Sequence, residues 1–144
     1  MPSAKDAAKD AGEDEGDRVN PVLRFVDAVN QGDVDGVESA FHPDFEMIVP
    51  QHPERGFKGR DQEVKNMRHL MTTHPEGRIT VRRVVRSGDE VWVQNSYRSD
   101  GLEMEAVVIY EIDPATDTIL VGHYYSEKVD RGGPEINAWM RALG

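Results

Sequence analysis

The spacing of apolar residues predicts three helices in the first half of the chain. The first begins at Asn20-Pro21, where an N-cap residue precedes a proline at the first helical position. Its apolar residues recur three and four positions apart, as one buried helix face requires: Val22, Phe25, Val26 and Val29. Asp33 caps a second helix, and Arg60-Asp61 begin a third. Between the last two we expect a break at His42-Pro43-Asp44, a short strand over residues 45–49 and a loop over residues 50–59.

Four strand-like runs fill the second half of the chain, over residues 78–86, 90–98, 102–113 and 118–129. Each connection between them contains Gly, Pro, Asp or Ser, the residues that tight antiparallel turns require. A short amphipathic helix follows, and it either closes over the domain as a lid or docks against it. Its apolar residues are Ile136, Trp139, Met140 and Leu143. Helices followed by consecutive strands indicate an α+β fold, in which a twisted antiparallel sheet curls around helices on one face.

Composition indicates one modest core. The 144 residues are 38% apolar and 31% charged, as in an ordinary globular domain. Residues 1–18 contain no large apolar side chain other than Met1, so they cannot bury enough surface to become ordered. We therefore expect a disordered acidic tail over residues 1–18 and a single domain over residues 19–144.

The charge balance argues against two classes of partner. A formal net charge of −10 repels nucleic-acid phosphates and anionic membranes, so we expect neither partner. The longest uninterrupted apolar run, residues 106–110, is far too short to span a bilayer, and no signal peptide is visible. The absence of cysteine excludes disulfides and thiolate ligands, and the five histidines lack metal-binding spacing. We therefore expect a cytoplasmic protein with no metal and no other cofactor.

Three stretches carry a resemblance to a known superfamily. They are FVDAVNQGDVDGVESAFHPDFEM at residues 25–47, FKGRDQEV at residues 57–64 and IYEIDPATDTILVGHYYSEKV at residues 109–129. With the strands between them, they make the chain similar to the NTF2-like superfamily, also called SnoaL-like or ketosteroid-isomerase-like. The resemblance implies a cone-shaped curved antiparallel sheet wrapped on N-terminal helices, with an internal pocket and a homodimer formed through the outer face of the sheet. Members include isomerases, cyclases, dehydratases and proteins without catalysis, so the fold does not name the activity.

The catalytic residues known in that superfamily are replaced in this chain. Aligned on the quoted stretches, the oxyanion tyrosine, the base and the neutral aspartate of ketosteroid isomerases fall at Phe25, Val49 and Val108. A valine cannot accept a proton, so steroid isomerisation by that mechanism is not expected. The Arg-x-Asp pair and the last-strand Asp of limonene epoxide hydrolases fall at Asn95, Tyr97 and Tyr124, and the last-strand Asp of SnoaL-type cyclases falls at the same tyrosine.

The last strand, LVGHYYSEKV at residues 120–129, allows two registers. In the first, which we favour, its inward side chains are those of Gly122, Tyr124 and Ser126. In the second they are His123, Tyr125 and Glu127, because a shift of one residue turns every side chain to the other face. A bulge near the preceding turn permits either.

The favoured register predicts a small-molecule site. Its apolar wall consists of Phe25, Met47, Val49 and Val108, and its orienting polar groups are Tyr97, Asn95 and Tyr124. The ligand would be a compact, largely apolar molecule that carries a carbonyl or hydroxyl oxygen. An alternative is an isomerase, dehydratase or cyclase in which Tyr124 polarises a carbonyl and His52 or His123 moves a proton. A third hypothesis is a non-catalytic dimerisation module whose cavity is filled by its own side chains.

Overall fold

The structure is a computed structural model, and it describes residues 20–144; the tail expected over residues 1–18 lies outside the described part. The helices are α2 (Asn20–Gln31), α3 (Val34–Ala40), α4 (Arg60–Thr73) and α5 (Ile136–Ala142), with a 3-10 turn at Pro53–Arg55. The strands are β1 (Phe41–Ile48), β2 (Phe57–Lys58), β3 (Arg78–Ser87), β4 (Glu90–Ser99), β5 (Leu102–Asp113) and β6 (Thr118–Lys128).

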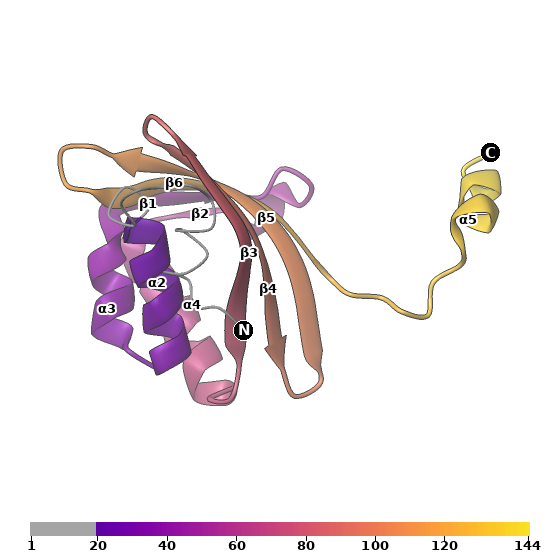
Figure 1. Ribbon diagram of the computed structural model, residues 1–144, viewed down its shortest axis with the longest axis horizontal. Helices are drawn as coiled ribbons and strands as arrows, with labels where there is room; N and C mark the ends of the chain where they lie inside the picture. Colours follow the sequence, from indigo (N-terminus) through magenta and orange to yellow (C-terminus); the bar gives the residue numbers. More distant parts are fainter. Residues whose placement is uncertain (1–19) are drawn as a thin grey trace.

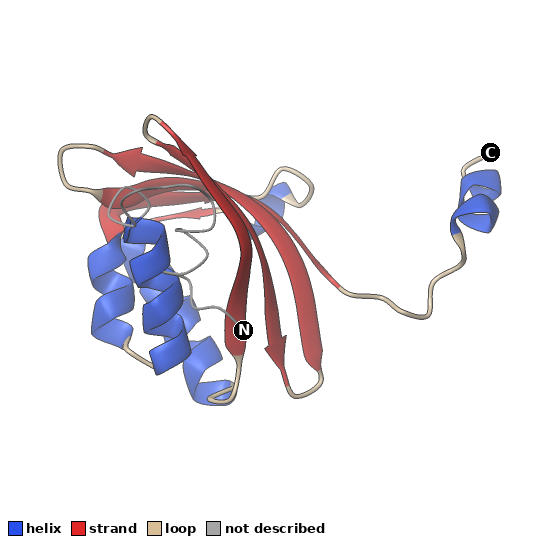
Figure 2. Ribbon diagram, viewed as in Figure 1, coloured by secondary structure: helices blue, strands red, loops and turns tan. Residues whose placement is uncertain are grey.

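The six strands form one curved sheet in the order β2-β1-β6-β5-β4-β3. All neighbouring strands are antiparallel except β1 and β6, which run parallel and are separated in the chain by β2, α4 and the three strands β3–β5. The sheet bends strongly and does not close, and α2, α3 and α4 lie together on its concave side (Figures 1 and 2). The predicted α+β fold with a cone-shaped sheet around the N-terminal helices is therefore confirmed.

The boundary between α3 and β1 differs from the prediction. His42-Pro43-Asp44 does not break the chain before the strand but lies inside β1, which begins at Phe41. The ladder between β1 and β6 shifts register between Phe41 and Glu46, and this irregularity accommodates a proline that cannot donate to the ladder.

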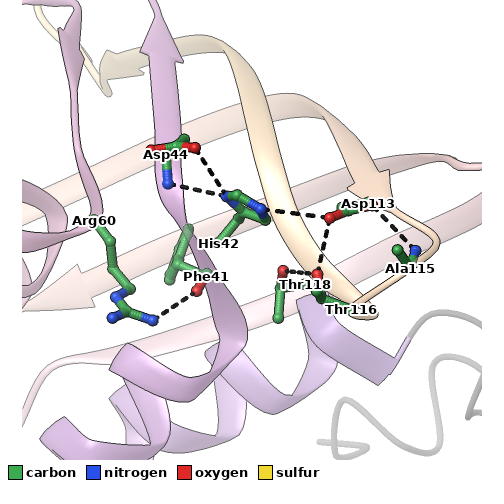
Figure 3. Close-up of polar contacts among 8 residues, drawn as sticks. All are labelled: Phe41, His42, Asp44, Arg60, Asp113, Ala115, Thr116 and Thr118. Carbon is green, nitrogen blue, oxygen red and sulfur yellow. Dashed lines mark hydrogen bonds and ion pairs between the residues drawn. The ribbon is translucent and has the colours of Figure 1, made fainter.

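Side-chain contacts hold this irregular part of β1 against the β5–β6 turn (Figure 3). The imidazole Nδ1 of His42 accepts a hydrogen bond from the backbone N–H of Asp44 at 2.9 Å, and its Nε2 lies 3.4 Å from a carboxylate oxygen of Asp113. The same Asp113 carboxylate accepts bonds from the Ala115 N–H and the Thr116 hydroxyl within the turn, both at 3.0 Å. The sequence His-Pro-Asp thus reads as a loop, but the His42 ring contacts Asp113, which lies in a turn far along the chain.

The register of β6 is the first of the two that the sequence allows. The ladder pairs Glu111 with Val121 but Ile112 with Ile119, so Leu120 is an extra residue on β6. Beyond it, Gly122 lies opposite Tyr110 and Tyr124 lies opposite Val108, whose buried side chain faces the helices.

The inner core is built around three aromatic rings. Phe41 packs edge-to-face on Phe25 of α2, with ring centres 4.9 Å apart, and on Phe45 of β1, at 4.7 Å. Phe25 and Val108, both predicted to line a pocket, are 7% and 2% exposed and belong to this core.

One side chain connects the end of α2 to the beginning of β3. The Asn30 amide nitrogen donates to the carbonyl oxygen of Ile79 at 2.9 Å, and its amide oxygen accepts from the Ile79 N–H at 2.7 Å. Asn30 therefore satisfies both backbone groups of Ile79, which lies on the edge strand β3 and has no neighbouring strand on that side.

The C-terminal helix lies apart from the rest of the molecule. Residues 129–135 lead away from the end of β6, and α5 stands at the far end of this segment (Figure 1). It is therefore neither a lid over the sheet nor a helix docked on its own domain, the two arrangements that the sequence left open. Between residues 20 and 144, none of the helices is both long and apolar enough to cross a lipid bilayer.

Replacing Asn30 with alanine should destabilise the fold by about 1–3 kcal/mol, because the part-buried Ile79 backbone groups lose their partners. The measurement is urea unfolding at equilibrium. Gln31→Ala is the matched control, because Gln31 is exposed at the next position and should change the free energy of unfolding by less than about 0.5 kcal/mol. Equal losses in both variants would contradict a specific role for Asn30.

Candidate functional site

A polar cluster lies inside the curved sheet, where α4 faces β5 and β6. It consists of Glu63 from α4, Tyr110 from β5 and Tyr124 from β6. Glu63 is 3% exposed and Tyr110 is 2% exposed. The two tyrosine rings pack edge-to-face with their centres 5.8 Å apart.

Gly122 provides the space that the Tyr124 ring needs. The ring bends back over Gly122 toward Tyr110, which lies directly across the ladder. A Cβ atom at position 122 would lie 3.2 Å from the ring carbon Cζ and would overlap Cε1. A glycine two positions before Tyr124 is therefore a local requirement of this ring position.

Burial sets the charge state of the cluster. It raises the pKa of Glu63 from 4.5 to about 7, and the neighbouring Tyr124 hydroxyl lowers it by a smaller amount. Burial also raises the pKa of Tyr110 and of Tyr124 well above the usual value for a phenol. Near neutral pH both tyrosines are hydrogen-bond donors, and Glu63 is poised between its neutral and ionised forms.

The Tyr124 hydroxyl is a buried polar group without a hydrogen-bond partner. Its oxygen is inaccessible to solvent and makes no hydrogen bond of ordinary geometry, although Glu63 and Tyr110 are close enough to change its pKa. The remainder of the tyrosine is only half-buried, so part of its ring reaches the inner surface of the sheet. Such an arrangement can donate a hydrogen bond to an oxygen that approaches from that surface, while Glu63 gives or takes a proton.

The other predicted polar groups share the inner face of the sheet with Tyr124. Asn95 lies opposite Ala106 and Tyr97 lies opposite Met104, and all four are half-buried. The Tyr97 hydroxyl is buried and also makes no hydrogen bond.

Tyr97 lines a cavity of about 250 Å³ at the end of the sheet where α2 and α4 finish. Apolar residues Val29, Leu70 and Met71 form much of the wall, and His74 lies at its edge. A Cβ at Gly77 would lie 2.7 Å from Cζ of Tyr97, so this glycine gives Tyr97 its place.

Met47 and Val49 contribute to a different hollow. They line an open cavity of about 490 Å³ formed by β1, the edge strand β2 and the loop that connects them. The lining residues predicted from the sequence are thus divided: Tyr97 belongs to one cavity, Met47 and Val49 to another, and Phe25 to the core.

Both predicted catalytic histidines are hydrogen-bonded to carboxylates outside the polar cluster. His52 Nε2 lies 2.7 Å from Oε1 of Glu127, and His123 Nε2 lies 2.7 Å from Oε2 of Glu111. Because β6 has the first register, His123 projects from the outer face of the sheet, opposite to Tyr124. The structure brings neither histidine to Tyr124 and puts Glu63 there instead.

Sequence reasoning missed Glu63 and Tyr110, although each has a periodic signal. Glu63, Met67 and Met71 are four residues apart, so the helical period alone puts the carboxylate on the apolar face of α4. Tyr110 alternates with Val108 and Ile112, which identifies it as an inward residue of β5. Among residues 20–144, no group of three or more His, Asp or Glu side chains could hold a metal ion.

Glu63→Gln should change how stability depends on pH. Between pH 4.5 and 7 the folded protein retains a Glu63 proton that the unfolded chain has lost, so this contribution to stability disappears as the pH rises through about 7. Glutamine stays neutral, so the variant should gain about 2–3 kcal/mol relative to the wild type from about pH 5 to about pH 8 in urea unfolding. Glu38→Gln, at an exposed position of α3, is the control; equal pH profiles of both variants would contradict the raised pKa.

Comparison with known proteins agrees with the fold. The chain is similar in structure to a provisionally assigned ketosteroid isomerase from Kribbella flavida, with a TM-score of 0.67 and 15% identity over 84% of this chain and 85% of the other. It is also similar to a provisionally assigned SnoaL-like polyketide cyclase from Shewanella putrefaciens, with a TM-score of 0.68 and 11% identity over 85% and 87% of the two chains. A protein of unknown function with a cystatin-like fold from Methylobium petroleophilum gives a TM-score of 0.69 and 14% identity over 83% and 82%.

These identities are low enough that the structural similarities establish the fold alone. A comparison with curated protein sequences finds no match. The model of the SnoaL-like domain family, however, matches residues 22–119, which include every helix and strand from α2 to the start of β6 except for the first residues of α2. The chain therefore belongs to the SnoaL-like domain family, within the NTF2-like superfamily.

Proposed function

We propose that this protein binds a compact, largely apolar small molecule through an oxygen atom that accepts a hydrogen bond from Tyr124. The observation that carries the proposal is the buried Tyr124 hydroxyl without a hydrogen-bond partner. Buried polar groups almost always have a partner, and one that lacks it in the free protein is suited to acquire it from a ligand. A carbonyl or hydroxyl oxygen is the simplest acceptor.

The surface beside Tyr124 supports a ligand of this kind. Along the inner face, the next side chains beyond Tyr124 and its neighbour Val108 are Ser126 and Ala106, both small and half-buried. Asn95 and then Tyr97 follow across the sheet, so the polar groups at the two ends of this surface are the unpartnered hydroxyls of Tyr124 and Tyr97.

The facing helix offers an adaptable wall. Met67 and Met71 of α4 pack against the core from the helix side and are only partly buried. Methionine side chains are unbranched and flexible, so they can adjust to a guest without moving the backbone. The names of the relatives from Kribbella flavida and Shewanella putrefaciens refer to steroids and polyketides, which carry carbonyl or hydroxyl oxygens on extended carbon frameworks.

A second candidate is an enzyme that transfers protons on such a molecule: an isomerase, a dehydratase or a cyclase. The specific observation is that Glu63, with a pKa raised to about 7 by burial, lies next to the unpartnered Tyr124 hydroxyl. A general acid–base group works best when its pKa is close to the operating pH. Glu63 would take a proton from a carbon beside the carbonyl group while Tyr124 stabilises the developing negative charge on the oxygen. His52 and His123 would have no part in this mechanism.

Binding is tested by a thermal-shift screen with steroids, terpene epoxides, aromatic polyketides and small enones. A ligand present at about one hundred times its dissociation constant should stabilise the fold by about 2.7 kcal/mol, which corresponds to a shift of roughly 5–15 °C. Tyr124→Phe should weaken binding about tenfold, since one hydrogen bond is lost, with little change in stability. Tyr125→Phe is the control, because its hydroxyl lies on the outer face of the sheet.

Two outcomes would contradict the binding proposal. Unchanged affinity in Tyr124→Phe would show that the ligand does not use this hydroxyl. A flat response to every compound at millimolar concentration would favour the third hypothesis, a dimerisation module whose interior is filled by its own side chains.

Catalysis is tested with any compound that binds. Glu63→Gln should abolish turnover but retain binding within a few-fold, and the wild-type rate should change with an apparent pKa near 7. His123→Ala, which removes an imidazole on the outer face, should keep the wild-type rate and pH profile. Turnover that survives in Glu63→Gln and is lost in His123→Ala would overturn the assignment of Glu63.

A further inference from the structure

The apolar face of α5 is exposed in the described structure. Ile136, Trp139, Met140 and Leu143 are three and four residues apart, so they project from the same side of the helix. They are 63%, 47%, 55% and 63% exposed. A helix of seven residues is not stable in water by itself, so α5 needs a surface on which this face is buried.

A second apolar surface covers the outer face of the sheet. We call it the outer patch and define it as Val85, Trp92, Val107, Ile109 and Tyr125. Val85, Trp92 and Ile109 lie opposite one another on β3, β4 and β5, and Val107 lies opposite Tyr125 on β5 and β6. Four of the five are 39–58% exposed, which is unusual for large apolar residues that are contiguous across four strands.

Several charged groups around the outer patch are paired with one another. Arg82 lies 3.2 Å from Glu105, and His123 lies 2.7 Å from Glu111. The Trp92 indole N–H donates to the Glu90 carboxylate at 2.6 Å. Arg83 is also exposed, at the β3 end of the row that contains Val107 and Tyr125. A segment that docks on the patch therefore meets an apolar surface with paired charges at its sides and one arginine at its β3 edge.

The segment that contains α5 has a matching character. Residues 129–144 contain two acidic residues, Asp130 and Glu135, and two basic residues, Arg131 and Arg141, so their formal charges cancel. The whole chain has a net charge of −10, which opposes the association of two copies. A neutral, apolar segment is the part of the described chain best suited to contact a second copy despite this repulsion.

Contacts at the beginning of this segment direct it away from its own domain. The Arg131 guanidinium donates to both carboxylate oxygens of Glu103, at 2.7 and 2.8 Å, and the Val129 N–H donates to the Glu103 carbonyl oxygen at 2.9 Å. Arg98 also binds this carboxylate, at 2.9 Å. From this fixed point the chain continues beyond the end of β6, and α5 lies far from its own outer patch (Figure 1).

We propose that α5 of one copy packs its apolar face on the outer patch of a second copy, and that the second copy returns the contact, giving a homodimer with exchanged C-terminal helices. Two surfaces that are largely apolar and exposed belong to the same chain, and the contacts of Val129 and Arg131 with Glu103 keep them apart within one molecule. A reciprocal exchange of α5 buries both surfaces in a closed assembly with two-fold symmetry. This inference is independent of any ligand inside the sheet.

The test uses the absence of cysteine from the chain. Full-length Met140→Cys, on the apolar face of α5, is mixed with full-length Val107→Cys, in the outer patch, and treated with a short thiol-specific cross-linker. The expected product is a mixed covalent dimer containing one copy of each variant. Ala138→Cys, which projects from the opposite side of α5, is the matched control and should give at least fivefold less mixed dimer.

Sedimentation velocity supplies an independent measurement on proteins without cross-links. The wild type should sediment as a dimer, and Trp139→Asp should sediment as a monomer while its circular dichroism stays unchanged, because Trp139 is exposed within one molecule.

Three results would overturn the proposal. One is a cross-link that forms within a single chain of the double variant Met140→Cys/Val107→Cys and never in the mixture, since α5 would then fold back on its own sheet. Another is cross-linking of Val107→Cys with itself and not with Met140→Cys, since the sheets would then pack directly on each other. The last is a wild type that remains monomeric at concentrations up to the millimolar range.

Discussion

The arrangement of this protein depends on one extra residue in the last strand. Leu120 has no counterpart on β5, and this bulge puts Ile119 and Gly122 on the same face of the sheet although they are three positions apart. Everything beyond the bulge follows from it: Tyr124 points into the interior, and His123 and Tyr125 point outward. Without the bulge the strand would turn over, a histidine would face α4, and the buried tyrosine would be part of the outer surface.

The buried cluster of Glu63, Tyr110 and Tyr124 lowers the stability of the fold and supplies groups that can bind a ligand or move a proton. A carboxyl group surrounded by apolar side chains is unfavourable when ionised, and burial therefore holds Glu63 close to neutral at pH 7. Two phenols that stay protonated lie beside it, and one of them makes no hydrogen bond. Groups of this kind gather where a protein binds or transforms a ligand more often than where it only packs, because a core of similar volume without them would be more stable.

Because the sheet is curved, its concave and convex faces have different surroundings. The concave face is covered by α2 and α4 and contains the polar cluster and the unpartnered hydroxyls of Tyr97 and Tyr124. The convex face has no covering helix in the described molecule, and it displays the apolar outer patch between the paired side chains of Arg82 with Glu105 and His123 with Glu111. Successive side chains of a strand project from opposite faces, so Tyr124 points into the interior and its neighbour Tyr125 points to the outer surface.

The sequence by itself determined the order of helices and strands, most of their boundaries and the family. Helical spacing in α2, the Asp33 cap and the turn residues between β3, β4, β5 and β6 are local signals, and the family resemblance depended on the same elements. It also established that β6 had two possible registers and named the one that the structure has. Three things were decided only by the tertiary structure: the continuation of β1 through Pro43, the meeting of Glu63 with Tyr110 and Tyr124, and the separation of Met47 and Tyr97 into different cavities. Each depends on contacts between residues distant in the chain, such as His42 with Asp113 or Glu63 with Tyr124, and local periodicity carries no information about which distant side chains will meet.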